Sequence, residues 1–201
     1  IRSRVRRVGL KVPSVEDVAQ LLITRNGIEP GLARSAAAEA QSHIGMALRL
    51  ATSAEARARR KEVLQSALSI NSVTAAVKTS DRWLELAKKD AEQMSSERDG
   101  QEKADLLATM GLSDKDTVPP ALRSELKRLE DAQKRRNTRS ERDGLDRVLV
   151  DLLALYRDVL SVQLSASVDL VNEDLADQIR EVAVQTKPAD SIHKLEAIEQ
   201  A

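Results

Sequence analysis

The chain has 201 residues, enough for one or two domains, and its 32 Lys and Arg residues equal its 32 Asp and Glu residues in number. This balance predicts neither a nucleic-acid partner nor a membrane partner, so only the local distribution of charge is informative. The absence of cysteine excludes disulfides and thiolate metal sites, and no apolar run approaches the ~20 residues of a membrane span, so we expect a cytoplasmic protein.

Aromatic residues make up 1% of the chain, and there is no phenylalanine. A core without rings has to be built from Leu, Val, Ile and Ala, which suits closely packed helices better than a β-sandwich or barrel. Glycine and proline are few, with 7 and 5 copies, so long helices are expected. The composition therefore predicts an all-α fold.

The chain begins with IRSRVRRV, in which arginines alternate with apolar or small residues, and no acid occurs before Glu16. This alternation predicts a short strand over residues 2–8. Because a single strand cannot pair its own backbone, we expect residues 1–10 to be the last strand of a domain whose other strands precede Ile1.

Residues 11–66 carry the signals of a small three-helix subdomain. Ser14 is a predicted N-cap, with acids in the following turn, for a helix that ends at Asn26-Gly27. Pro30-Gly31 opens a second helix over residues 32–41, and a third begins near Ser42.

Residues 67–201 predict a larger antiparallel helical bundle with long arms. One apolar stripe at helical spacing consists of Val73, Val77, Leu84, Ala87, Ala91 and Met94. Two further, mostly apolar stripes, which we call registers, lie before and after the polar run 134–144: Leu122, Leu126, Leu129 and Gln133, then Leu145, Leu149, Leu152, Tyr156 and Val159. Two terminal segments, 168–184 and 191–198, are also predicted to be helical. The run from Gly111 to Pro120 is a predicted loop, and Lys187-Pro188 separates the terminal helices.

No motif in the chain makes a complete active site. His43 and His193 are far apart and neither belongs to a ligand-spaced cluster, and no glycine-rich phosphate loop is present. Residues 123–142 carry eight basic and four acidic residues, which fits a solvated face, although a grip on phosphate stays open. Without interleaved aromatic residues, this segment offers no stacking platform for single strands.

The tripeptide Tyr156-Arg157-Asp158 has two interpretations. In one, Tyr156 belongs to the core, and Arg157 and Asp158 form a surface pair. In the other, the three residues contribute to an interface between subunits.

Ser3-Arg4 at a strand end, followed by a linker containing proline and three short helices, resembles the Ser-Arg-Cys segment and lid of the clamp-loader branch of AAA+ proteins. The resemblance implies that Arg4 is an arginine finger, supported by Ser3, that reaches the ATP bound by a neighbouring subunit. A planar, permanently charged guanidinium suits this task because it can bridge phosphate oxygens as charge develops on them.

The third predicted helix adds a second resemblance. ATP-hydrolysing clamp-loader subunits carry a nucleotide-sensing arginine in Gly-Ser-Leu-Arg-Asp-Ala-Leu, whereas residues 42–48 read SHIGMAL, with Gly45 in the arginine's place and Arg49 one turn further on. This pattern, together with residues 139–160, is similar to the delta-prime family of bacterial clamp-loader subunits. Val5 departs from the family's cysteine, and the loop at Gly111 is longer and more polar than expected.

The resemblance implies a division into a remnant strand of a nucleotide-binding domain (1–10), a helical lid (11–66) and a collar that assembles subunits into a ring (67–201). It also implies the DNA polymerase III holoenzyme, a DNA-directed DNA polymerase, with the tau/gamma and delta subunits, the sliding clamp and primed DNA as partners. This chain then contributes no catalytic site and binds no cofactor, because the ATP belongs to the neighbour.

Two alternatives remain open at this stage. The chain is a fragment of the ATP-hydrolysing tau/gamma subunit, which Gly45 argues against. Otherwise it is a helical interaction module unrelated to ATP, whose arginine-rich start binds the backbone of nucleic acid.

Overall fold

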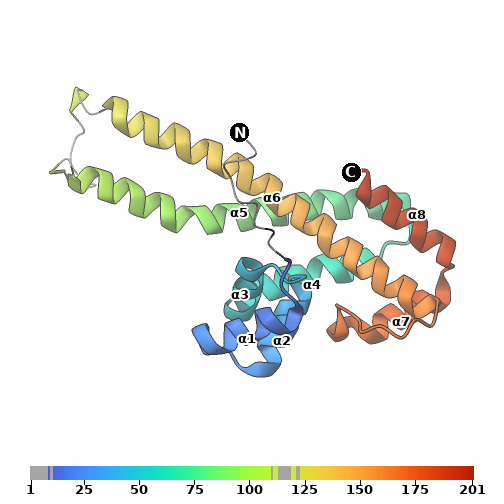
Figure 1. Ribbon diagram of the computed structural model, residues 1–201. Coiled ribbons are helices and arrows are strands. Elements are labelled where there is room, and N and C mark those ends of the chain that lie inside the picture. The colour runs from blue at the N-terminus through green and yellow to red at the C-terminus, as the bar shows by residue number, and fades with distance from the viewer. Residues whose placement is uncertain (1–8, 10, 110, 113–118, 121–122) are drawn as a thin grey trace, which may run out of the picture.

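The computed structural model describes residue 9 and residues 11–109, 111–112, 119–120 and 123–201, and every regular element in these ranges is a helix (Figure 1). The all-α prediction is therefore confirmed for the described residues, while the predicted strand over residues 2–8 lies outside them. The helices are α1 (Val15–Asn26), α2 (Pro30–Glu39), α3 (Ile44–Thr52), α4 (Ala54–Leu68), α5 (Val73–Thr109), α6 (Arg123–Gln163), a 3-10 turn η3 (Glu173–Leu175), α7 (Ala176–Gln185) and α8 (Pro188–Glu199).

Helix α1 begins and ends where the sequence predicts. The Ser14 hydroxyl oxygen accepts a hydrogen bond from the Asp17 backbone N–H at 3.1 Å, and the Asp17 carboxylate accepts one from the Ser14 backbone N–H at 3.0 Å. The Ser14 hydroxyl also donates to the Asp17 carboxylate at 2.7 Å, and this bond, together with the one from the Ser14 backbone N–H, favours the ionised form and lowers the pKa of Asp17. Gly27 closes the helix with a φ of 66°, a conformation that glycine adopts without strain.

The N-terminus of helix α2 is capped by a glutamate side chain, a less usual residue in this position. The Glu29 carboxylate accepts from the backbone N–H groups of Gly31 and Leu32 at 2.9 and 2.8 Å, which lowers the pKa of Glu29. Helix α2 ends at Glu39, two residues before the predicted end, because Gln41 and Ser42 adopt positive φ.

The first hydrophobic cluster lies among α1, α2 and α3, and small side chains let these helices approach closely. We call α1–α3 the three-helix unit. The buried residues of the cluster are Val18, Ala19, Leu22, Ala33, Ala36, Ala37, Ala40, Ala47, Leu50, Ala51 and Ala56.

Helix α4 links this cluster to a second one. Its Ala56 belongs to the first cluster, whereas Val63 and Leu64 belong to the second, which α4 forms with α5, α6, α7 and α8. The boundary predicted between residues 66 and 67 falls in the last turn of α4. The interpretation of the two parts as lid and collar stays a prediction.

Helices α5 and α6 pack against each other and project from the rest of the molecule (Figure 1). The two apolar registers expected before and after the polar run 134–144 lie on one uninterrupted helix of 41 residues, α6, except for Leu122, which is outside the described residues. At 100° per residue the two registers are roughly 140° apart around this helix. The first register lies on the side of α6 that contacts α5 in the projecting part, and the second register packs into the second cluster. Helix α6 therefore makes contacts on two different sides.

Gly144 lies where α6 packs against α5. A Cβ atom at this position would lie 3.4 Å from the Ala87 carbonyl oxygen. The polar run therefore ends at a helix contact that requires a small residue.

The apolar stripe predicted on α5 is only partly buried. The helix that this stripe predicts is confirmed, but Val73, Val77 and Leu84 are 82%, 57% and 51% exposed. The Trp83 indole N–H donates to the Ser66 hydroxyl oxygen at 2.9 Å, and Leu86 is buried beside it. The first half of the stripe therefore faces solvent, whereas Ala87 and Ala91, on the same face of the helix, are buried.

The helix predicted over residues 168–184 begins later than expected, since residues 168–172 are not helical and α7 starts at Ala176. The Asp158 carboxylate accepts from the backbone N–H groups of Val171 and Asn172 at 3.2 and 2.9 Å. A side chain of α6 therefore takes the donors that a helix would use. The predicted break at Lys187-Pro188 is confirmed.

Candidate functional site

The predicted finger residues Ser3 and Arg4 lie outside the described residues, so their role stays a prediction. The described chain runs continuously from Lys11, shortly before α1. If residues 1–10 carry the finger, the three-helix unit is the part of the described structure next to it in the chain. The position of the finger then depends on how the three-helix unit is attached to the second cluster.

Arg60, on α4 and only 8% exposed, is the centre of that attachment. Its guanidinium donates from Nε to Asp151 Oδ1 at 3.3 Å, from Nη1 to Glu39 Oε2 at 3.3 Å and from Nη2 to Asn172 Oδ1 at 2.6 Å. These partners belong to α6, to α2 and to the segment before η3. One buried side chain therefore joins three parts of the fold.

Arg147 and Gln41 complete the attachment. The Arg147 guanidinium, on α6, donates to Asp151 Oδ1 at 3.0 Å and to the Glu39 carbonyl oxygen at 2.8 Å. The Gln41 amide donates to the Val150 carbonyl oxygen at 3.2 Å. The end of α2 is thus bound to the middle of α6 through side-chain and backbone groups, and we call Glu39, Arg60, Arg147, Asp151 and Asn172 the junction network.

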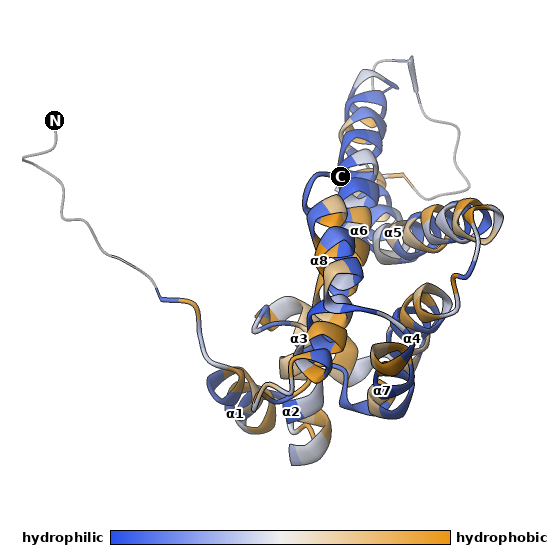
Figure 2. Cartoon of the chain, turned by 90° about the vertical axis from the view of Figure 1, so that its right-hand side faces the viewer, coloured by the Kyte–Doolittle hydropathy of each residue, from blue (hydrophilic) through white to orange (hydrophobic). Residues whose placement is uncertain are grey.

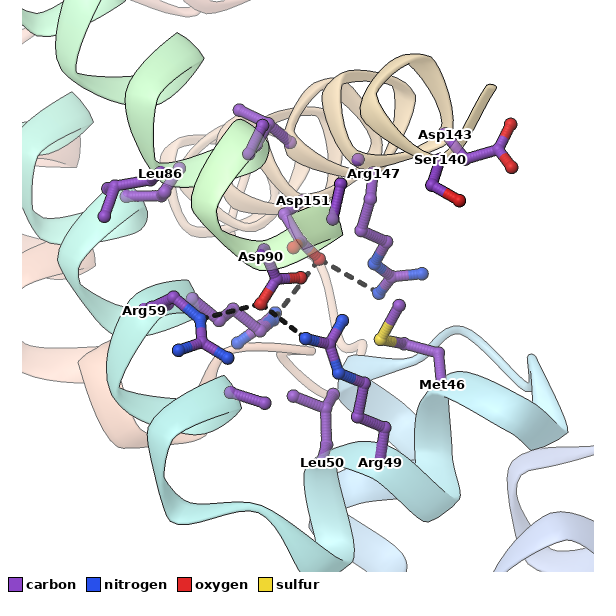
Figure 3. A pocket seen from close by; sticks show the side chains of 17 residues that line it. Met46, Arg49, Leu50, Arg59, Leu86, Asp90, Ser140, Asp143, Arg147 and Asp151 are labelled. Carbon is purple, nitrogen blue, oxygen red and sulfur yellow. Dashed lines mark hydrogen bonds and ion pairs between the residues drawn. The ribbon is translucent and has the colours of Figure 1, made fainter. Parts of the chain in front are cut away.

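A second ion-pair group lies beside the junction network. Figure 3 shows the Asp90 carboxylate of α5 between the guanidiniums of Arg49 and Arg59, which come from α3 and α4. The Arg59 Nε lies 2.7 Å from Asp90 Oδ1. Arg49 is the residue one turn beyond Gly45, and its charge is engaged by this chain's own aspartate.

Between these groups lies a cavity of about 210 Å³, lined by residues of α3, α4, α5 and α6 (Figure 3). Each of its four guanidiniums is already paired: Arg49 and Arg59 with Asp90, Arg60 and Arg147 with Asp151. Most of the remaining lining is apolar, including Leu50, Val63, Leu86 and Val148. Because each of these cations already has a carboxylate partner, the cavity favours contact between helices over capture of a free anion.

The structure places Tyr156 in the second cluster, with 8% of its surface exposed. Its hydroxyl donates to the Ala67 carbonyl oxygen at 3.4 Å, and the Lys194 ammonium lies 4.8 Å from the ring centre. Burial disfavours the phenolate and raises the pKa of Tyr156. Tyr156 therefore packs in the hydrophobic core of this chain.

Asp158 is fully buried and is also used internally, through Val171, Asn172 and the guanidinium of Arg157 at 3.0 Å. The Arg157 side chain is 52% exposed. Of the predicted tripeptide, Arg157 alone offers much of its side chain to another molecule, and the subunit interface itself stays a prediction.

The junction network could hardly have been predicted from the sequence. Arg60 lies in the run EARARRKEVL, which has the composition of a solvated helix, and Asn172 lies in a segment predicted to be helical. The one available signal is Arg147 four residues before Asp151, a spacing that brings both side chains to one face of a helix. That signal cannot identify the distant partners Glu39 and Arg60.

Comparisons with models of protein families, with curated proteins and with solved structures found no match. Across the described ranges, no group of three or more His, Asp or Glu side chains has the arrangement of a metal site. Within the same ranges, no helix is both long enough and apolar enough to cross a membrane. The interpretation of the site therefore depends on its own geometry and on the sequence motifs.

Proposed function

We propose that the chain is the C-terminal part of a delta-prime type subunit of the bacterial DNA polymerase III clamp loader. In this role it does not hydrolyse ATP but acts as a stator, the rigid member of a ring of subunits. Residues 67–201 assemble with the other loader subunits as the collar, and Arg4 reaches the ATP of the neighbouring tau or gamma subunit. The assembled loader places the sliding clamp on primed DNA in replication.

The observation that supports this proposal best is the junction network. A trans-acting arginine is effective only when its scaffold holds it within about 0.5 Å of the productive geometry. Arg60 binds α2, α6 and the segment before η3 from a buried position, and Arg147 binds both Asp151 and the end of α2. Such a junction suits a stator, because the three-helix unit cannot pivot on the bundle without breaking buried ion pairs.

The state of Arg49 fits the non-hydrolysing role. Its guanidinium is bound by Asp90, so a rotation of α3 toward a nucleotide would leave a half-buried carboxylate with one partner fewer. Gly45, in the position of the family's sensing arginine, has no side chain to contact phosphate. The proposal therefore assigns the catalytic charge to the neighbour's site through Arg4.

The proposal is tested by replacing Arg4→Ala in the full-length subunit and assembling it into a loader whose other ATP sites are inactivated. Turnover at the neighbouring site should fall by about 10³–10⁵-fold, the range typical of arginine fingers. Assembly, measured by size-exclusion chromatography, should be unchanged. Arg6→Ala removes the same charge from the same run and is the matched control. Unchanged turnover with Arg4→Ala would contradict the proposal.

A further inference from the structure

The projecting part of the molecule consists of residues 95–109 of α5 and 123–142 of α6, which we call the arm (Figure 1). The helices α7 and α8 pack on α6 beyond this part, in the second cluster. In Figure 2 the end of α6 that rises above the rest of the molecule is mostly blue or pale, the colours of hydrophilic residues. The arm is therefore a polar extension whose purpose the core does not explain.

The inner face of the arm is held together by charge. Arg136 on α6 pairs with Asp99 at 3.0 Å and with Glu102, both on α5. The Gln133 amide donates to the Asp99 carbonyl oxygen at 3.0 Å. Hydrogen bonding to Arg136 lowers the pKa of Glu102, and the same bond raises the pKa of Arg136. Arg136 thus binds α6 to α5.

The other seven basic residues of the arm segment of α6 have a different arrangement, and all are exposed. At 100° per residue they fall within about 160° of the helix circumference, on the side away from Arg136, and they span about 28 Å along the axis. We call them the basic face: Arg123, Lys127, Arg128, Lys134, Arg135, Arg139 and Arg142.

Few acids neutralise this face. Asp131 is exposed in the middle of the face and Glu130 is exposed at its edge, while Glu141 is half-buried. The ion pairs found in the described ranges include none of Lys127, Arg128, Lys134, Arg139 and Arg142. Arg82 on α5, by comparison, is also exposed but pairs with Glu62 at 2.9 Å. The chain as a whole is neutral, so these five cations outside any ion pair are a local accumulation of charge on the extension.

We propose that the basic face of the arm binds the sugar-phosphate backbone of double-stranded nucleic acid without reading its sequence. A duplex presents a negative charge for every ~1.7 Å of its axis, so a row of cations about 28 Å long meets phosphates along its whole length. The face carries no aromatic residue on which single-stranded bases would stack. It carries no apolar row that would enter a lipid surface. Duplex backbone is thus the polyanion that its chemistry fits best.

The test uses the 201-residue chain and a fluorescent 20-base-pair duplex, with affinity measured by anisotropy between 50 and 200 mM salt. The variant Lys127→Gln/Lys134→Gln/Arg139→Gln removes three charges from the basic face. Its affinity at low salt should fall at least tenfold. The slope of log affinity against log salt should become shallower by about 2.7, since each phosphate contact contributes ~0.9. Circular dichroism checks that the variant remains folded.

The matched control is Lys78→Gln/Lys88→Gln/Lys89→Gln, which removes three exposed charges from the same chain outside the arm. This control should bind the duplex like the unmodified chain. Equal affinities of the two triple variants would overturn the proposal, and so would binding to vesicles containing phosphatidylserine without binding to duplex.

One further variant separates this proposal from the interpretation in which the first residues bind nucleic acid. Replacement of Arg2, Arg4, Arg6 and Arg7 by glutamine should leave duplex binding largely intact. If this variant alone abolished binding, the arm would not be the binding surface. The inference does not depend on the proposed function, because the Arg4→Ala experiment measures ATP turnover of the neighbouring subunit.

Discussion

The substitution Arg60→Met tests the stiffness of the junction between the three-helix unit and the bundle. Methionine preserves most of the packing volume of the arginine stem but donates no hydrogen bond. It leaves Asn172 Oδ1 without the donor at 2.6 Å and removes one cation from each of Asp151 and Glu39. Loss of one member of a buried ion pair costs about 3–5 kcal/mol.

We expect the lower end of that range, about 3 kcal/mol, because the two carboxylates keep other partners. Asp151 retains Arg147 at 3.0 Å, and Glu39 retains the Ser35 hydroxyl at 2.7 Å. The control is Arg82→Met, which breaks ion pairs to Glu62 and Glu85 on the surface and should cost under about 1 kcal/mol.

The free energy of unfolding is measured by urea titration with two probes. Far-ultraviolet circular dichroism follows all helices, whereas Trp83 fluorescence follows the second cluster, against which Trp83 packs. In Arg60→Met, amide hydrogen exchange should accelerate throughout α1–α3, because the three-helix unit loses its buried attachment. Equal and small losses of stability in Arg60→Met and Arg82→Met would refute the reasoning.

Two further predictions concern helix interiors and acid. Gly100 is exposed, and a Cβ atom added there would meet no other part of the chain within 4 Å, so Gly100→Ala should raise stability by about 0.5–1 kcal/mol. Gly144→Leu should lower it by about 1–3 kcal/mol, because the side chain enters the contact with Ala87; a neutral result would show that α5 moves away freely. Asp17 and Glu29 have pKa values below their ordinary 3.8 and 4.5, so the stability that they contribute is present above those values and is lost as pH falls through the lowered ones. Urea titrations from pH 6 to 3 should therefore show a shallower loss in Asp17→Asn/Glu29→Gln than in the unmodified chain, and identical slopes would contradict this.

The parts of the fold that the sequence predicts well are those determined by neighbouring residues. Ser14, Asp17 and Gly27 form the caps of α1 through contacts within a few positions, so local chemistry is sufficient. The break at Pro188 follows from a ring that cannot continue the preceding segment. Helix content was predictable for the same reason.

The parts that could not be predicted depend on contacts between distant residues. Residues 168–172 have a helical pattern, but Asp158 on another helix takes their backbone donors. Val73 and Ala87 share one face of α5, but only Ala87, which lies against Gly144 of α6, is buried. A periodic pattern indicates which side chains share a face and does not identify what that face meets.

The same limit applies to the charged residues. Eight basic residues between 123 and 142 look alike in the sequence, yet the structure separates Arg136, bound to α5, from the seven on the basic face. Arg60 likewise cannot be distinguished from Arg59 and Arg57 by composition, although it is the one bound to α2, α6 and the segment before η3.

Since α6 runs without interruption through 41 residues, its two ends have a fixed angular phase. Deleting one residue near Gly144 would turn the tip by about 100° relative to Asp151, whereas deleting seven would restore the orientation to within about 20°. The direction in which the cations point is therefore encoded as a residue count between two distant positions. An insertion or deletion in this stretch is therefore tolerated only if its length keeps the orientation of the basic face, whatever residues it contains.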